Sequence, residues 1–421
     1  MAFQTALSGL NAASGNLNVT GHNIANASTT GFKKSRADFA DVYAVSFGGV
    51  SKTATGSGVR LASVTQQFTQ GNIDFTDNNL DLAVSGEGFF ILNDNGTQLY
   101  TRAGNFSVDR DGYVVNVHGQ RVQQYAVDPD TGIVSNFTPM DLQLNLGANP
   151  ASPTTRIDIN VNLDAGVTPI DSVANPALIV APVPDPNTYN FSTTTTIYDS
   201  LGVTHEATLY FRKDDTMPAN EWDATLVITD ADGTVNQMDT IPVQFSDNGT
   251  LLTTGDQDFL ATAGAWTPST GAADFTTFDI NFAGSTQFGA NSAVNALHQD
   301  GYTTGRLSGI SVDSNGVLFA RYTNGQSATV GAIAMARFSN PNGLQQVGDT
   351  NWAASFESGD VLPGQAGTGT FGQIQSGALE SSNVDISKQL VNMIVAQRDF
   401  QANAKMITTE DQITQTIINI R

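Results

Sequence analysis

The side chains best able to do chemistry here are aspartates, and three short aspartate-rich runs have the spacing that begins a calcium loop. They are Asp109–Gly112, Asp128–Asp130 and Asp230–Gly233. Carboxylate oxygens suit Ca²⁺, but a complete loop also needs a bidentate glutamate at position 12, between two helices. None of the runs continues in that way, and Asp or Asn before Gly is ordinary in hairpin turns. We therefore predict turns at these places and no metal site.

Other catalytic and cofactor-binding patterns are incomplete. Gly367–Gly372 matches the dinucleotide fingerprint by letter, but it follows a turn-rich segment and opens no helix, so we interpret it as a flexible connector. The four histidines, which are His22, His118, His205 and His298, lie far apart, and no serine elbow or cysteine is present. Carboxylate pairs of the glycosidase kind stay open, because nothing singles one out. We predict that the protein is not an enzyme and binds no cofactor.

Long helical patterns occupy both ends of the chain. At the N-terminus apolar or small side chains follow alternating steps of four and three, as in a coiled-coil seam: Phe3, Leu7, Leu10, Ser14, Leu17, Gly21 and Ile24. Over 384–421 the corresponding positions are Ile386, Leu390, Met393, Phe400, Ala404, Ile407, Ile413, Ile417 and Ile420. A helix of about 24 residues is marginal alone in water. We therefore expect the two helices to pair with each other and with copies of themselves.

The charge is strongly negative and unevenly placed. The formal net charge is −22, which argues against a nucleic-acid partner. Residues 148–300 hold 19 Asp and Glu against 3 Lys and Arg, a local balance of −16. Such an excess keeps a surface solvated and discourages clumping.

The first residues do not resemble a cleavable secretion signal. The first 20 contain no Lys or Arg and no continuous apolar core. No run approaches the roughly 20 apolar residues of a membrane span. If the protein is exported, we expect an uncleaved signal and another route, and we expect no membrane insertion.

Between the helices the pattern is strand and turn, and an internal repeat suggests how it is divided. Residues 106–114 and 310–318 share one strand–turn–strand device on either side of the acidic middle. We infer that 71–147 and 301–363 form one β domain, into which 148–300 is inserted as a second. The remaining parts are helices at 1–30 and 384–421 and connecting segments at 31–70 and 364–383. This predicts an α+β multidomain chain with paired terminal helices and nested barrel-like or sandwich-like β domains.

Both ends resemble the signatures of bacterial flagellar rod, hook and hook-associated axial proteins. The matching runs are Ala6–Asn11, His22–Lys33, Gly377–Asp385 and Ala396–Lys405. The signature positions in the second run are Asn23, Ala25, Asn26, Thr30, Gly31 and Phe32; His22 stands where that family usually has Asn. Asp81–Phe90 and Tyr100–Phe106 are shared with rod proteins. Gly301–Gly309 and the Asn351–Gly359 region are more typical of the hook branch.

The resemblance implies a structural subunit of the flagellar hook, exported through the flagellar type III pathway and located outside the cell. In such an assembly paired terminal helices line an inner tube, and β domains face outward. The tube is curved and flexible, a universal joint that transmits motor torque from the basal-body rod to the filament. The implied partners are copies of the chain, rod proteins, hook–filament junction proteins, a hook cap, a length-control protein and the export apparatus.

Three alternatives remain at this stage. The first is another flagellar axial protein, such as a distal rod or hook–filament junction subunit. The second is a secreted adhesin-like β protein or a calcium-dependent surface protein. The third is an extracellular glycosidase, which requires a carboxylate pair in a cleft.

Overall fold

The computed structural model describes residues 2–42, 56–128, 133–178, 185–260 and 264–419. The chain forms two compact units. The first comprises Met1–Leu146, Ser308–Arg321 and Ser327–Arg421, and the second comprises Gly147–Leu307 with Tyr322–Gln326. The finer six-part division expected from the sequence stays a prediction.

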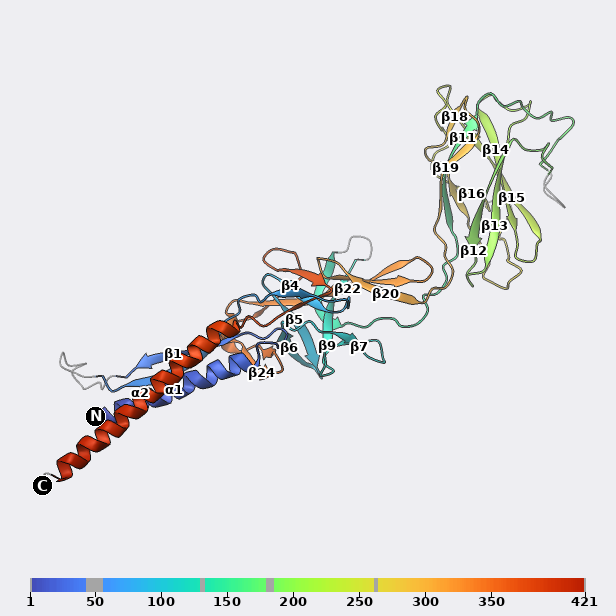
Figure 1. The fold of residues 1–421 in the computed structure, drawn as a ribbon. Coiled ribbons are helices and arrows are strands. Elements are labelled where there is room, and N and C mark those ends of the chain that lie inside the picture. The colour runs from blue at the N-terminus through green and yellow to red at the C-terminus, as the bar shows by residue number, and fades with distance from the viewer. Residues whose placement is uncertain (1, 43–55, 129–132, 179–184, 261–263, 420–421) are drawn as a thin grey trace. The chain divides into compact units, whose positions relative to one another are not determined.

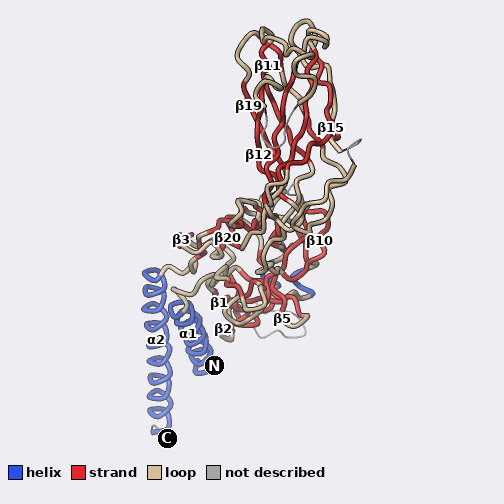
Figure 2. The backbone as a smooth tube through the Cα atoms, turned by 90° about the vertical axis from the view of Figure 1, so that its right-hand side faces the viewer, coloured by secondary structure: helices blue, strands red, loops and turns tan. Residues whose placement is uncertain are grey.

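The first unit contains the two terminal helices, which pack against each other (Figures 1 and 2). Helix α1 spans Ala2–Ala25 and helix α2 spans Ile386–Asn419. Strands β1 (Ser35–Asp41) and β2 (Val59–Gln66) form an antiparallel hairpin that also contacts α1. Most of the Gly, Ser and Thr stretch at 46–58, expected to be extended or flexible, lies outside the described residues.

The β part of the first unit is built on a 13-stranded sheet whose main path is β20-β21-β22-β9-β5-β6-β25-β24. The strands of that path are β20 (Leu307–Val312), β21 (Val317–Tyr322), β22 (Ser327–Ile333), β9 (Arg121–Val127), β5 (Phe89–Asp94), β6 (Thr97–Thr101), β25 (Asn351–Ala353) and β24 (Gln345–Gly348). The strands beside it are β7 (Ser107–Val108), β8 (Val114–Val115), β10 (Val134–Asp141), β23 (Met335–Phe338) and β26 (Val361–Gly364). Two short 3₁₀ turns, η1 (Pro341–Gly343) and η2 (Phe356–Ser358), contact each other.

Two further strand pairs tie the returning chain to the β part. β27 (Gln373–Ser376) pairs with β4 (Leu82–Ser85), and β28 (Ala378–Glu380) pairs with β3 (Ile73–Phe75). The segment 364–383, expected to be a connector, therefore contains strands. Runs of three and four residues carry too little periodicity to be visible in sequence. Ile374 of β27 is buried in the same core as Phe90 and Leu92.

The second unit is a β sandwich. One sheet is an antiparallel meander of β12 (Phe191–Tyr198), β13 (Thr204–Arg212), β14 (Glu221–Thr229) and β15 (Val235–Gln244). The other contains β11 (Arg156–Asp164), β16 (Asp256–Asp258), β17 (Asp279–Asn281), β18 (Thr286–Phe288) and β19 (Ala293–Gln299). Alternate side chains of β11, such as Ile157 and Ile159, share one core with Phe211 and Trp222 of the meander, as the period of two along a strand requires. The expected fold class, mainly-β domains between paired terminal helices, is confirmed.

Candidate assembly surface at the chain termini

The contact between α1 and α2 uses small side chains. Ala6 and Ala13 of α1 are buried, as is Ala396 of α2. Between them Gly9 lies against Asn403, so closely that a Cβ atom on Gly9 would stand 2.5 Å from Asn403 Oδ1. Small residues allow two helix backbones to approach each other. The two helices therefore pack closely because the residues at their contact have small side chains.

On α2 one line of residues recurs every seven positions, at Gln389, Ala396 and Asn403, and its member Asn403 contacts Gly9 of α1. Gln389 and Ala396 are buried and Asn403 is half-buried. This line lies next to the predicted seam rather than on it. On α1 the matching signal in the sequence is the spacing of the small residues Ala6, Gly9 and Ala13. A search for large apolar residues does not detect it.

The predicted seam residues are mostly left open by the single chain. Leu10, Leu17, Ile24, Met393, Ala404 and Ile407 are half-buried. The exposed ones are Phe3, Leu7, Ile386, Leu390, Phe400, Ile413 and Ile417. Ile420 lies outside the described residues. Within one chain the seam is therefore not a closed core, and its role between copies stays a prediction.

The exposed apolar side chains of both helices form what we call the terminal apolar surface. On α2 they include Val391, Ile394, Met406 and Ile418 as well as the exposed seam residues, and Ile394 is 64% exposed. They lie on faces of α2 other than the one turned to α1. A helix that is apolar on several faces is normally buried on several faces, and large exposed apolar patches mark interaction sites. This surface is incomplete without a partner.

Helix α1 is joined to the rest of the unit by its own signature residues. Asn23 is buried and exchanges two hydrogen bonds with the backbone of Ser35 at the start of β1, at 2.7 and 2.8 Å. Asn26 donates from its side chain to the His22 carbonyl at 2.9 Å, which gives this carbonyl at the helix end a second donor beside the Asn26 backbone N–H. Ala25 is exposed, and Thr30 is half-buried.

The turn after α1 is held against the strand that precedes α2. Gly31 donates its N–H to the Glu380 carbonyl at 2.8 Å and has a φ of 70°. A Cβ there would stand 2.4 Å from the backbone nitrogen of Ala103, so only glycine fits. Phe32 is buried and meets the His22 ring edge-on at 5.5 Å. These contacts explain why a Gly–Phe pair occurs at this position.

A buried ion cluster fixes the same junction. Lys33 Nζ lies 2.6 Å from Glu380 Oε1 and donates to the Thr69 carbonyl at 2.9 Å, and Arg102 lies 3.4 Å from the other Glu380 oxygen. Burial lowers the pKa of Lys33, and the neighbouring Glu380 carboxylate opposes that shift. Gly71 adds a backbone N–H to Glu380 at 2.9 Å. Because buried charges are tolerated only when paired, these groups hold the segments that follow α1 and precede α2 in one arrangement.

Asn383 adds hydrogen bonds at the same junction. Its Oδ1 accepts the Lys34 backbone N–H at 2.8 Å, and its amide nitrogen donates to the carbonyls of Gln67 at 2.8 Å and Thr69 at 3.0 Å. One side chain thus ties together the residue just before β1, the segment just after β2 and the segment before α2. Sequence reasoning placed Asn383 in a signature but did not assign it a role.

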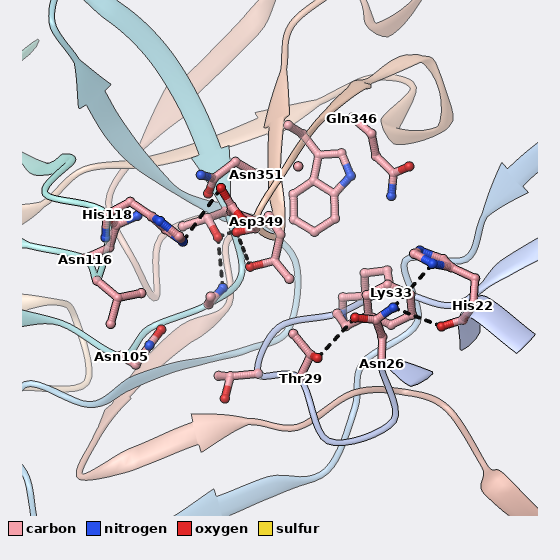
Figure 3. Close-up of a pocket in the computed structure, with 18 residues that line it drawn as sticks. His22, Asn26, Thr29, Lys33, Asn105, Asn116, His118, Gln346, Asp349 and Asn351 are labelled. Carbon is pink, nitrogen blue, oxygen red and sulfur yellow. Dashed lines mark hydrogen bonds and ion pairs between the residues drawn. The ribbon is translucent and has the colours of Figure 1, made fainter. Parts of the chain in front are cut away.

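Beside this junction lies a cavity of about 460 Å³, which we call the α1-end cavity (Figure 3). Its lining includes His22 and Asn26 at the end of α1, His118 and Asp349 from loops of the β part, and Asn351 at the start of β25. His118 Nε2 and Asp349 Oδ2 are 3.8 Å apart. Within the described ranges, no group of three or more His, Asp or Glu side chains is arranged to hold a metal ion, and no helix is long and apolar enough to cross a membrane.

Four known flagellar families match successive parts of the chain. They are the flagella basal body rod protein at residues 3–33, the flagellar hook protein FlgE/F/G D1 domain at 83–169, the flagellar basal body protein FlaE D2 domain at 162–302, and the flagellar basal body rod FlgEFG protein C-terminal at 375–420. The flagellar hook protein FlgE of Salmonella typhimurium is 40% identical over 436 residues, with 100% of each chain covered. The chain belongs to the flagellar hook protein family. This family is structural rather than enzymatic.

Further relatives agree with this assignment. FlgE of Escherichia coli K12 is 39% identical, with 100% of each chain covered. FlgE of Borreliella burgdorferi is 34% identical, covering 100% of this chain and 99% of that one. The crystal structure of Helicobacter pylori flagellar hook protein FlgE2 matches with a TM-score of 0.53 at 16% identity, covering 73% of this chain and 100% of that chain. That structural likeness concerns the fold. Hook proteins thus account for the chain along its whole length.

Proposed function

We propose that this protein is the structural subunit of a bacterial flagellar hook, which assembles with copies of itself into a curved, flexible tube. The tube joins the basal-body rod to the filament and transmits the motor's torque. The observation that carries the proposal is the terminal apolar surface, which one chain cannot cover. Full-length similarity to hook proteins supports the same role.

Cohesion of the tube comes from the terminal helices. Burying one Leu, Ile or Phe side chain is worth roughly 1.5–3 kcal/mol. Several such residues in each copy, including Leu390, Ile394 and Ile417, outweigh the cost of ordering the chain ends when every copy has neighbours. Because the gain depends on neighbours, the helices are poorly ordered in the free monomer and become ordered on assembly.

The inserted acidic unit supplies compliance. A rotating curved tube requires each copy to shorten and lengthen its contacts once per turn. Dry interlocked cores resist such sliding because they are not continuously deformable. Polar, hydrated surfaces exchange contacts at low cost, and residues 148–300 carry the largest share of the negative charge.

The other partners follow from the family. They are the rod proteins, the hook–filament junction proteins, a hook cap, a length-control protein and the flagellar type III export apparatus. Export uses an uncleaved N-terminal region, and the assembled protein lies outside the cell. Loss of the protein should leave a basal body without a bent connector in electron micrographs.

Two polymerisation experiments test the proposal. Purified chain should form sedimenting, curved tubes, whereas Leu10→Asp should remain soluble with an unchanged β signal in circular dichroism. Tube formation by Leu10→Asp at the wild-type concentration would reject the helical interface. Deleting 148–300 should give straight or stiff tubes, and a complete loss of tubes would contradict the proposed division of roles.

A further inference from the structure

A fully exposed aromatic ring stands on a rigid turn in the β part of the first unit. Phe356 begins the short turn η2 and is the most exposed large apolar side chain among the described residues. Ser355 Oγ accepts the Glu357 N–H at 3.1 Å, and Ser358 Oγ accepts the Ser355 N–H at 3.0 Å. Asn340 donates from its side chain to the Glu357 carbonyl at 3.0 Å. We call residues 355–358 the Phe356 turn.

This turn cannot fold back to cover its ring. Ser358 is completely buried, and a Cβ on Gly343 of the adjoining turn η1 would stand 2.4 Å from the Glu357 carbonyl carbon. The backbone is therefore clamped while the ring remains in water. Exposed apolar area has a free-energy cost that docking removes. A fixed, uncovered aromatic side chain has the geometry of a knob for a partner.

The same unit also carries a matching hollow, the α1-end cavity. Apolar groups of Phe32, Val117 and Trp352 line it, and His22 and His118 belong to opposite parts of its rim (Figure 3). Its volume of about 460 Å³ lies within the usual range of binding pockets. Val117 is 76% exposed there, so the hollow contains uncovered apolar surface of its own.

One wall of this cavity is built from strained and incompletely bonded residues. Asp349 and Thr350, in the turn between β24 and β25, both have positive φ, at 51° and 58°. That conformation is costly for a β-branched residue such as Thr. The neighbouring Asn351 is buried, and its amide oxygen makes no hydrogen bond within the part of the chain that the structure describes. Strain and an unmet hydrogen bond favour a wall that is completed by a ligand.

The polar groups around the knob and the hollow are complementary. Glu357 and Asp360, both exposed, flank Phe356 with carboxylate acceptors. His22 and His118 are exposed at the rim of the cavity, and the exposed Asp349 carboxylate lies 3.8 Å from His118 Nε2. His22 is therefore the rim imidazole that is left to donate to a carboxylate of a neighbouring copy. An aromatic anchor with acidic neighbours thus fits a hollow with an apolar floor and this donor at its rim.

We propose that the Phe356 turn of one copy docks into the α1-end cavity of a neighbouring copy. Knob and hollow are different surfaces, so the contact is head-to-tail, and such contacts build open helical polymers when the rotation between copies does not close a ring. The inference rests on the proposed function, because it needs copies assembled into a tube. It adds a contact in the β part to the contact between terminal helices.

Crosslinking of the full chain tests the contact directly, because the sequence contains no cysteine. In polymers of Phe356→Cys/Val117→Cys, a short bis-maleimide should produce a ladder of covalent dimers, trimers and longer chains. The matched control is Phe75→Cys/Val117→Cys, since Phe75 of β3 is another aromatic residue with 81% exposure. The proposal is overturned if polymers of the first variant give no ladder, or if the control gives an equal one.

A second measurement separates this proposal from the proposed function. Phe356→Ala should raise the critical concentration for polymerisation at least about tenfold, with an unchanged circular dichroism spectrum, whereas Phe75→Ala should not. Equal polymerisation of wild type and Phe356→Ala rejects the knob and leaves the hook assignment intact. Failure of the wild type to polymerise rejects the proposed function itself.

Discussion

A close approach between the terminal helices, that of Gly9 to Asn403, permits a quantitative prediction. Replacing Gly9 by Ala places a Cβ 2.5 Å from Asn403 Oδ1 and 2.9 Å from Asn403 Cγ. Overpacking costs about 1–3 kcal/mol, and the lower end applies here because the atoms met belong to the flexible, half-buried side chain of Asn403. Ala in place of Gly gains about 0.5–1 kcal/mol in a helix interior. Gly9→Ala should therefore be about neutral overall, but about 1 kcal/mol, or roughly fivefold in critical concentration, worse than an alanine that meets no clash.

The matched control is Gly21→Ala on the same helix, because a Cβ there meets nothing within 4 Å. That variant should assemble as well as the wild type or slightly better. Adding Asn403→Ala to Gly9→Ala removes the clash and should recover the gain from alanine, with a coupling energy of about 1 kcal/mol in the double-mutant cycle. Light scattering against protein concentration gives the critical concentrations of the wild type, Gly9→Ala, Asn403→Ala and the double variant for the cycle, and that of Gly21→Ala for comparison. Additive effects, or equal effects of Gly9→Ala and Gly21→Ala, would refute the assigned helix contact.

Three further predictions concern the other parts of the molecule. Ile417→Asp should abolish sedimenting polymer while circular dichroism retains the β signal; normal tubes would reject the terminal apolar surface. Glu380→Gln leaves Lys33 and Arg102 buried without a counter-charge and should lower the free energy of unfolding by about 3–5 kcal/mol in urea titrations, so a change below about 1 kcal/mol would contradict the role of that cluster. Burial opposes ionisation of Asp199, but hydrogen bonds, including one from Thr270, lower its pKa overall. A carboxyl group whose pKa is lower in the folded state stabilises the fold at pH values above its unfolded-state pKa. That stabilisation is lost as the pH falls through the folded-state pKa. Tryptophan fluorescence should therefore show the inserted unit losing stability below about pH 4, and Asp199→Asn should weaken that dependence.

The parts of this fold that sequence could predict are those with a long, regular pattern. The four-and-three spacing from Phe3 to Ile24 gave α1, and the pattern over 384–421 gave α2. The strand-and-turn pattern between the helices predicted β structure there, and the runs Thr208–Phe211 and Thr225–Ile228 lie in β13 and β14. A regular spacing of apolar residues arises when the same face of a helix or strand is buried along its length. These elements have such a face, so the sequence predicts them.

The rest depended on contacts between distant segments. Lys33 and Glu380 are 347 positions apart, so no local pattern joins them. β28 is strand only because it pairs with β3. The line of Ala6, Gly9 and Ala13 is marked only by the absence of large side chains. Because small residues also occur where no other helix approaches, their spacing alone does not predict a helix contact. The heptad spacing located the terminal apolar surface, but it did not show which face of each helix packs against the other helix within one chain.

The most direct test of the account is a helical reconstruction, by electron microscopy, of tubes grown from the purified chain. We expect curved hollow tubes in which α1 and α2 pack against helices of neighbouring copies and cover Leu390, Ile394 and Ile417. Copies joined only through their β parts, with those side chains still facing solvent, would contradict the central claim.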